Sequence, residues 1–163
     1  MEFLDIVDKN DKVIGRASKD EIYKKILCHR IAHVLIFNDE GKMVLQMRSP
    51  NVSFCPNHWS TAVGGHVQAG ETYEQAALRE YSEELGVKSD LELLGKNFYK
   101  APNTPEKFLA TFKTRFSGPF NPDPKVVSAV GTFSIDEIKK MILSGEKFHP
   151  ELLFILKKYY LEI

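Results

Sequence analysis

The stretch GGHVQAGETYEQAALREYSEELGV, from Gly64 to Val87, joins paired glycines to a segment that crowds like charges. Thr72 can cap the start of a helix here, and Gly86 can end it in a left-handed conformation. Three glutamates in this helix are spaced three and four residues apart: Glu80, Glu83 and Glu84. Because that spacing places side chains on one helix face, the sequence predicts a carboxylate cluster that projects into a single volume.

The other residues of this helix divide between a core face and the acidic face. By the same spacing, the large side chains predicted to enter the core are Leu78, Tyr81 and Leu85. Ala76 and Ala77 are small, and we expect them beside the glutamates, where they leave room for a ligand. Arg79 stands four residues before Glu83 and can hold that carboxylate in place.

The crowded glutamates allow two interpretations. Like charges at this spacing destabilise an isolated helix by a few tenths of a kcal/mol per pair. A bound cation removes that cost, and hard oxygen ligands suit Mg²⁺ or Mn²⁺. The alternative is a solvated acidic face, which is the commoner explanation for a generic helix with three glutamates.

The segment from Gly65 to Val87 resembles the Nudix box. That pattern consists of Gly, five residues, Glu, seven residues, Arg-Glu, an aliphatic residue, any residue, Glu-Glu, any residue, Gly and an aliphatic residue. The sequence supplies the fixed residues at every required spacing: Gly65, Glu71, Arg79, Glu80, Glu83, Glu84, Gly86 and Val87. Tyr81 stands where an aliphatic residue is usual, and its predicted core position makes this a change in packing rather than in chemistry. A match at this many spaced positions is far more specific than a lone glycine motif.

The resemblance implies a metal site built from the box. The backbone carbonyl of Gly64 and the carboxylates of Glu80, Glu83 and Glu84 would hold one to three divalent ions, Mg²⁺ or Mn²⁺. The glycines, including Gly65, would let the backbone come close to the metal. Glu83 or Glu80 would orient or deprotonate the attacking water, and the sequence leaves open which of them does so.

Two further box residues have supporting roles by the same resemblance. Arg79 would brace the catalytic carboxylates. Glu71 would stabilise the turn that leads into the helix, near the helix N-terminus. The family's reaction is the cleavage of a nucleoside diphosphate linked to another group, and metal ions assist it by neutralising charge and acidifying water.

The rest of the chain predicts a mixed α/β or α+β fold. Strands are predicted over residues 3–7, 12–15, 30–38, 43–48, 60–67, 91–101, 106–117 and 126–133. Helices are predicted after the capping box 18–21, over 73–85, over 135–143 after a second capping box, and over 150–163. Together with the resemblance, this implies one Nudix domain over residues 1–163, an α/β/α sandwich with a mixed sheet between helices.

Nearly the whole chain also resembles the type 1 isopentenyl diphosphate isomerases, which share the Nudix fold but catalyse different chemistry. The segments that carry this resemblance are DIVDKNDKVIG, HRIAHVLIFNDEGKMVLQMRSP, TAVGGH and FNPDP. It places His29 and His66 where metal-binding histidines are expected, and Arg48 where a diphosphate-binding arginine is expected. Of these, we expect Arg48 and His66 to contact substrate.

The departures from the isomerases favour hydrolysis. Gly64 occupies the position of the isomerase catalytic cysteine, so a proton donor or acceptor for carbon chemistry is missing there. The downstream Glu-x-Glu metal motif is absent as such, and Glu106 is a weak substitute for it. We therefore predict a metal-dependent pyrophosphohydrolase acting on a nucleoside diphosphate derivative. An isomerase-like enzyme and a non-catalytic nucleotide sensor are the alternatives.

The bulk composition limits partners and location. Lys+Arg and Asp+Glu each number 22, so no overall charge attracts a nucleic acid polymer or a membrane surface. No signal peptide or membrane span is recognisable, and Cys28 and Cys55 lack metal-site spacing. The expected partner is a small diphosphate substrate in the cytoplasm. The substrate's identity and the choice between monomer and homodimer stay open.

Overall fold

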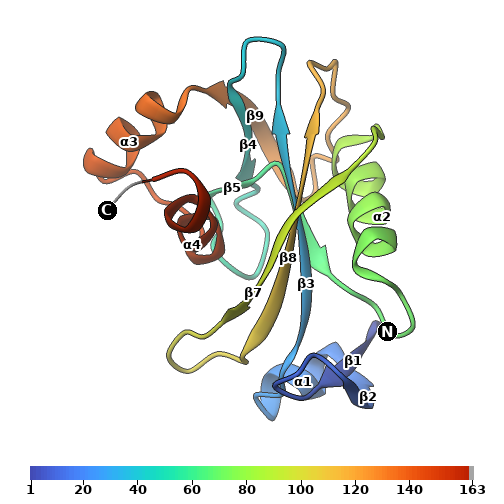
Figure 1. Ribbon diagram of the computed structural model, residues 1–163. Coiled ribbons are helices and arrows are strands. Elements are labelled where there is room, and N and C mark those ends of the chain that lie inside the picture. The colour runs from blue at the N-terminus through green and yellow to red at the C-terminus, as the bar shows by residue number, and fades with distance from the viewer. Residues whose placement is uncertain (162–163) are drawn as a thin grey trace.

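The chain folds into a mixed sheet with helices on both faces and a small N-terminal hairpin at one end (Figure 1). The structure is a computed structural model that describes residues 1–161. The strands in that range are β1 (Phe3–Val7), β2 (Val13–Ser18), β3 (His29–Phe37), β4 (Met43–Arg48), β5 (Trp59–Thr61), β6 (Val63–His66), β7 (Glu92–Tyr99), β8 (Lys107–Arg115) and β9 (Val127–Phe133). The helices are α1 (Lys19–Lys24), α2 (Tyr73–Leu85), α3 (Ile135–Leu143) and α4 (Pro150–Tyr159). This confirms the predicted fold class.

The long strand β3 organises the main sheet. It pairs in parallel with β8 along its whole length, while β7, β8, β3, β4 and β5 lie in sequence across the sheet. On its other edge, residues 31–34 pair with β6 and residues 36–37 pair with β4. This edge of β3 is therefore shared by two strands, β6 and β4. The strand that carries the paired glycines, β6, pairs directly with β3.

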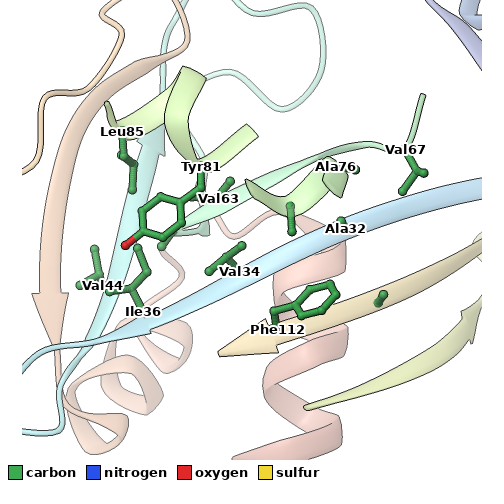
Figure 2. Packing of buried hydrophobic residues seen from close by; sticks show 13 residues of the cluster. Ala32, Val34, Ile36, Val44, Val63, Val67, Ala76, Tyr81, Leu85 and Phe112 are labelled. Atoms are coloured by element: carbon green, nitrogen blue, oxygen red, sulfur yellow. The ribbon is translucent and has the colours of Figure 1, made fainter. Parts of the chain in front are cut away.

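One hydrophobic core lies between α2 and the sheet (Figure 2). Its members from β3 alternate along the strand, at Ala32, Val34 and Ile36, because successive side chains point to opposite faces. Tyr81 of α2 is fully buried among them, and its hydroxyl forms a hydrogen bond of 2.9 Å with Ser89. The predicted core position of this tyrosine is confirmed.

A second core lies on the other face, beneath α3 and α4. It contains Leu35 from β3 together with Leu152, Ile155 and Leu156 from α4. Figure 1 shows both helices on the side of the sheet opposite α2. The two cores together make the predicted sandwich, with the sheet as its middle layer.

The helix ends follow the capping residues in the sequence. Thr72 and Gln75 form a capping box at the start of α2, and Gly86 ends this helix with a φ of 69°. Ser134 and Glu137 form the predicted capping box of α3. These contacts satisfy backbone groups that a helix end otherwise leaves without partners.

The N-terminal hairpin holds the segment that leads into α2. Leu4 of β1 bridges to Gln68, and the Gly70 amide donates to the Asp5 carboxylate at 3.0 Å. The tip of the hairpin is fixed by Asp11, which accepts hydrogen bonds from Arg30, Tyr73 and Lys96. The loop before the acidic helix is thus anchored by residues from the start of the chain.

Among the differences between predicted and observed element bounds, two are the largest. The segment 60–67, predicted as one strand, is divided into β5 and β6, because its two halves pair with different strands, β4 and β3. The last helix ends at Tyr159, before the predicted end at residue 163, whose last two positions lie outside the described residues. Among the described helices, none is both long and apolar enough to cross a membrane.

Candidate active site

Arg79 is the centre of the hydrogen-bond network at the start of α2. Its Nε and Nη2 donate to the two carboxylate oxygens of Glu71 at 2.8 and 3.0 Å, and Nη2 also donates to the His66 carbonyl at 3.0 Å. Its Nη1 contacts Glu80 at 2.7 Å and Glu83 at 3.4 Å. One guanidinium therefore connects β6, the turn after it and two turns of the helix, which a planar five-donor group can do.

Glu71 completes the turn between β6 and α2. Besides its paired contact with Arg79, it accepts a hydrogen bond of 2.8 Å from the backbone amide of Gln68. Burial alone would raise the pKa of Glu71, but the bonds from Arg79 and from the Gln68 amide hold it below its usual value. The carboxylate is therefore charged and closes the turn in one conformation.

Glu80 lies directly on the backbone of β6. A Cβ atom added at Gly65 would come within 2.6 Å of the Cγ and Oε1 atoms of Glu80. Any side chain at this position would displace the glutamate, so the glycine is required for the close approach of α2 to the strand.

Glu84 turns its carboxylate inward, beside Glu80. The residue as a whole is half-buried, and burial together with the Glu80 carboxylate raises the Glu84 pKa well above its usual value. Gln46 donates a hydrogen bond to it at 2.6 Å and also donates to the Ala62 carbonyl at 2.9 Å. Two carboxylates this close in a low-dielectric setting cannot both ionise readily without a cation.

The faces of α2 differ from the prediction in three residues. Ala76 and Ala77 are buried in the core rather than exposed beside a ligand space. Leu78 is half-exposed and lines a surface groove of about 450 Å³ next to Glu83. Successive helical residues are rotated by about 100°, so Leu78 turns away from the core that Ala77 faces. Glu84 lies seven residues after Ala77, which is close to two full turns, and therefore faces that core again.

The glutamates therefore lie at different depths. Glu83 is exposed over 59% of its side chain, whereas Glu80 is mostly covered. Within residues 1–161, no three acidic, histidine or cysteine side chains converge closely enough to hold a metal ion in this arrangement. The donor chemistry nevertheless fits Mg²⁺ or Mn²⁺, because Glu80 and Glu84 offer hard carboxylate oxygens side by side and no ion pair reaches Glu84 in the described part of the chain.

The two predicted substrate-binding side chains have partners other than the glutamates. The His66 ring accepts or donates a hydrogen bond with the Tyr23 hydroxyl at 2.7 Å and stacks on His29 at 5.5 Å. Burial, and then His29, lower the His66 pKa to about 3, so the ring is neutral near pH 7. Arg48 donates from Nε to the Phe54 carbonyl at 2.9 Å, within the loop after β4.

Sequence reasoning missed several polar residues of this region. Gln46, which donates a hydrogen bond to Glu84, could have been identified from the sequence, since it is the only polar residue in the apolar run 43–47. Glu151 was given no role beyond its place in the last predicted helix, yet it is buried against His33 and Lys107. Glu106, the weak candidate for a further carboxylate, lies 3.9 Å from Lys100 instead.

The two cysteines are free, and neither is activated as a nucleophile. Burial raises the pKa of both thiols, that of Cys28 to about 11. Since the thiolate is the reactive form, neither residue supplies the acid/base group that is missing at Gly64.

Comparisons with known proteins identify the family. Residues 28–154 match the model of the NUDIX domain. A Nudix hydrolase of Nostoc sp. is 31% identical over 168 residues, which cover 98% of this chain and 96% of the relative. Isopentenyl-diphosphate Delta-isomerase 2 of Photorhabdus laumondii is 32% identical over 125 residues, covering 76% of this chain and 70% of the relative.

A solved structure extends the likeness over the full fold. The crystal structure of DR0079 from Deinococcus radiodurans superposes with a TM-score of 0.84 and 27% identity, covering 98% of this chain and 100% of that chain. The family model, a relative that spans almost the whole sequence and the intact box around Arg79 lead to one assignment. The chain belongs to the Nudix family and is a Nudix hydrolase, an enzyme of the class that acts on phosphoric anhydride bonds.

Proposed function

We propose that this hydrolase is a metal-dependent pyrophosphohydrolase that cleaves the diphosphate bond of a nucleoside diphosphate derivative. The observation that supports this most strongly is the pair of neighbouring carboxylates of Glu80 and Glu84 beside β6, of which only Glu80 has an ion-pair partner, Arg79, among the described residues. A structural helix face has no need of such a pair, whereas a cation site does.

The proposed roles follow from depth and contacts. Glu80 and Glu84, with the Gly64 carbonyl and the more exposed Glu83, would hold Mg²⁺ or Mn²⁺. When bound, the ion supplies charge neutralisation at the diphosphate and acidifies a coordinated water. Glu83 reaches solvent, so it is the side chain best placed to orient or deprotonate the attacking water, with Glu80 as the alternative. Arg79 holds both carboxylates in position.

Arg48 and His66 are proposed to contact the substrate. The bond from Arg48 to the Phe54 carbonyl uses only Nε, so its terminal nitrogens are the part suited to a phosphate oxygen. His66 would act as a neutral hydrogen-bonding group, because its lowered pKa removes the positive charge. The enzyme is expected to work in the cytoplasm, since two free cysteines suit a reducing compartment.

A substrate screen tests the function. Purified protein with Mg²⁺ or Mn²⁺ would be incubated with nucleoside di- and triphosphates, nucleotide sugars, dinucleotides and isopentenyl diphosphate, and products separated by chromatography. Metal-dependent release of a nucleoside monophosphate is expected. Glu83→Gln is the matched control, expected to lower turnover by about a thousandfold with an unchanged melting curve. The proposal is overturned if the protein hydrolyses no phosphate ester or anhydride in a metal-dependent way.

The same screen decides the isomerase alternative, which the likeness to the Photorhabdus isomerase keeps open. Conversion of isopentenyl to dimethylallyl diphosphate would support it. The structure indicates that a cysteine at Gly64 alone would not convert this site into an isomerase site. A Cβ atom there would lie 3.0 Å from His33 Nδ1 and 3.3 Å from Thr61 Oγ1, so a cysteine would need its neighbours to move.

A further inference from the structure

The two glycines of β6 face opposite sides of the sheet. The Cβ direction of Gly65 points at Glu80 on the α2 side, and that of Gly64 points at His33 and Thr61 on the α4 side. This alternation is what a strand imposes on successive residues. Gly64 is thus confined between the acidic site and a polar cluster that the hydrolytic site does not use.

That cluster is a directed chain of hydrogen bonds. The Thr61 hydroxyl donates to the Val63 carbonyl at 2.9 Å, and its single hydrogen is then used. His33 Nδ1, 2.8 Å from Thr61 Oγ1, must therefore donate to that oxygen. His33 Nε2 lies 2.8 Å from one carboxylate oxygen of Glu151, and Lys107 donates to the other at 2.9 Å.

Stability alone does not account for this group of buried polar and charged side chains. Glu151, His33 and Lys107 are all buried. Removing charges from water is costly, and apolar replacements of buried ion pairs are often as stable or more so. What such a network supplies is a fixed orientation of its members. Its outer end is rigid, because Glu151 belongs to α4, which is packed into the second core.

The inner end of the chain reaches the acidic site. Val63 is followed directly by Gly64, and Gly64 by Gly65, against which the Glu80 side chain lies. We propose that Glu151, His33 and Thr61 form a positioning network that fixes Val63–Gly64, and with it the Gly64 carbonyl, for metal binding. The metal-binding part of this inference rests on the proposed function, but the coupling of Thr61 to Gly64 does not.

The chain offers a matched pair of variants. Thr61 and Thr111 are both completely buried, and His33 is adjacent to both, since it pairs with Thr111 across β3 and β8. The Thr61 hydroxyl is in the network, whereas the Thr111 hydroxyl has no hydrogen-bond partner among the described residues. Thr61→Val removes the hydroxyl that links His33 to the Val63 carbonyl. Thr111→Val makes the same chemical change next to His33 but leaves the network intact.

Two readouts on the full chain distinguish the outcomes. In metal-free protein labelled with nitrogen-15, the Gly64 amide should exchange with solvent several-fold faster in Thr61→Val than in wild type or Thr111→Val. The dissociation constant for Mn²⁺ should rise by about 10- to 100-fold in Thr61→Val alone. Thr61→Ser, which keeps the hydroxyl, should restore both values. If Thr61→Val does not fold, Thr61→Ala against Thr61→Ser makes the same comparison.

The outcomes separate this inference from the proposed function. Equal Gly64 exchange in the two valine variants overturns the network, whatever the metal affinity. Faster exchange without weaker Mn²⁺ binding overturns the link to the metal site. If wild type binds no Mn²⁺ while Thr61→Val still exchanges faster, the coupling to Gly64 holds and the proposed metal-dependent function fails.

Discussion

The two sides of β6 carry opposite charge balances. On the α2 side, one cation, Arg79, pairs with three carboxylates, those of Glu71, Glu80 and Glu83. The neighbouring Glu84 carboxylate has no ion pair in the described part of the chain. On the α4 side, one carboxylate, Glu151, is shared by His33 and Lys107. A deficit of positive charge identifies the side suited to an external cation, while a compensated cluster identifies the side that holds its own structure.

The largest expected effect comes from breaking the compensated side. Glu151→Ala leaves Lys107 and His33 buried without their carboxylate, and the free energy of unfolding should fall by about 3–5 kcal/mol in urea titrations. The double change Glu151→Met with Lys107→Met should recover most of this loss. Glu40→Ala, in an exposed turn, is the control and should change stability by less than about 0.5 kcal/mol. A loss below about 1 kcal/mol for Glu151→Ala would mean that the cluster is not compensated as described.

The next effect is on the acidic side and should appear in activity. Gly65→Ala places a methyl group where Glu80 lies, so hydrolysis should fall by about 100-fold. Gly15→Ala is the control, because a Cβ there meets only Ile6 Cδ1, at 3.5 Å. Rates are measured with melting curves for both variants. Normal hydrolysis by Gly65→Ala would show that Glu80 does not need its place against β6.

A smaller effect should appear when the protein is acidified. Burial lowers the pKa of His29 and His149 to about 4, from an ordinary value of 6.5. Between these values the unfolded chain binds more protons, so stability rises with pH and is lost as the pH falls through this window. From about pH 7.5 to about pH 5.5, the expected loss is about 1 kcal/mol per imidazole.

His149→Asn tests the contribution of one imidazole. Asparagine keeps an acceptor for the Glu151 amide, which His149 Nδ1 provides in the wild type, but it does not titrate in this range. Urea titrations at the two pH values should therefore give the variant a smaller loss than wild type. An equal loss would exclude His149 as a source of the pH dependence.

The sequence predicted the acidic side far better than the compensated one. Fixed spacing located Arg79 and the glutamates, since residues close in sequence on one helix are also close in space. Glu151 and His33 are 118 positions apart in the chain, and no local pattern reports that they meet. The helix faces were wrong at Leu78 because periodicity defines an apolar arc but not its centre, which the packing of Ala76 and Ala77 against β3 sets.

The smallest expected effect concerns the one departure from the box. Tyr81 stands where an aliphatic residue is usual, and the structure gives its hydroxyl a partner, Ser89, which in turn bonds Thr114 at 2.8 Å. Tyr81→Phe removes one hydrogen bond without leaving a cavity, so unfolding should become easier by about 1 kcal/mol while hydrolysis stays unchanged. Ser89→Ala should have a similar effect on stability, since it breaks the same contact. A tenfold loss of hydrolysis in Tyr81→Phe with little change in melting would contradict a role in packing alone. It would mean that the α2 side transmits changes from its core to the carboxylates, as the α4 side is proposed to do through Thr61.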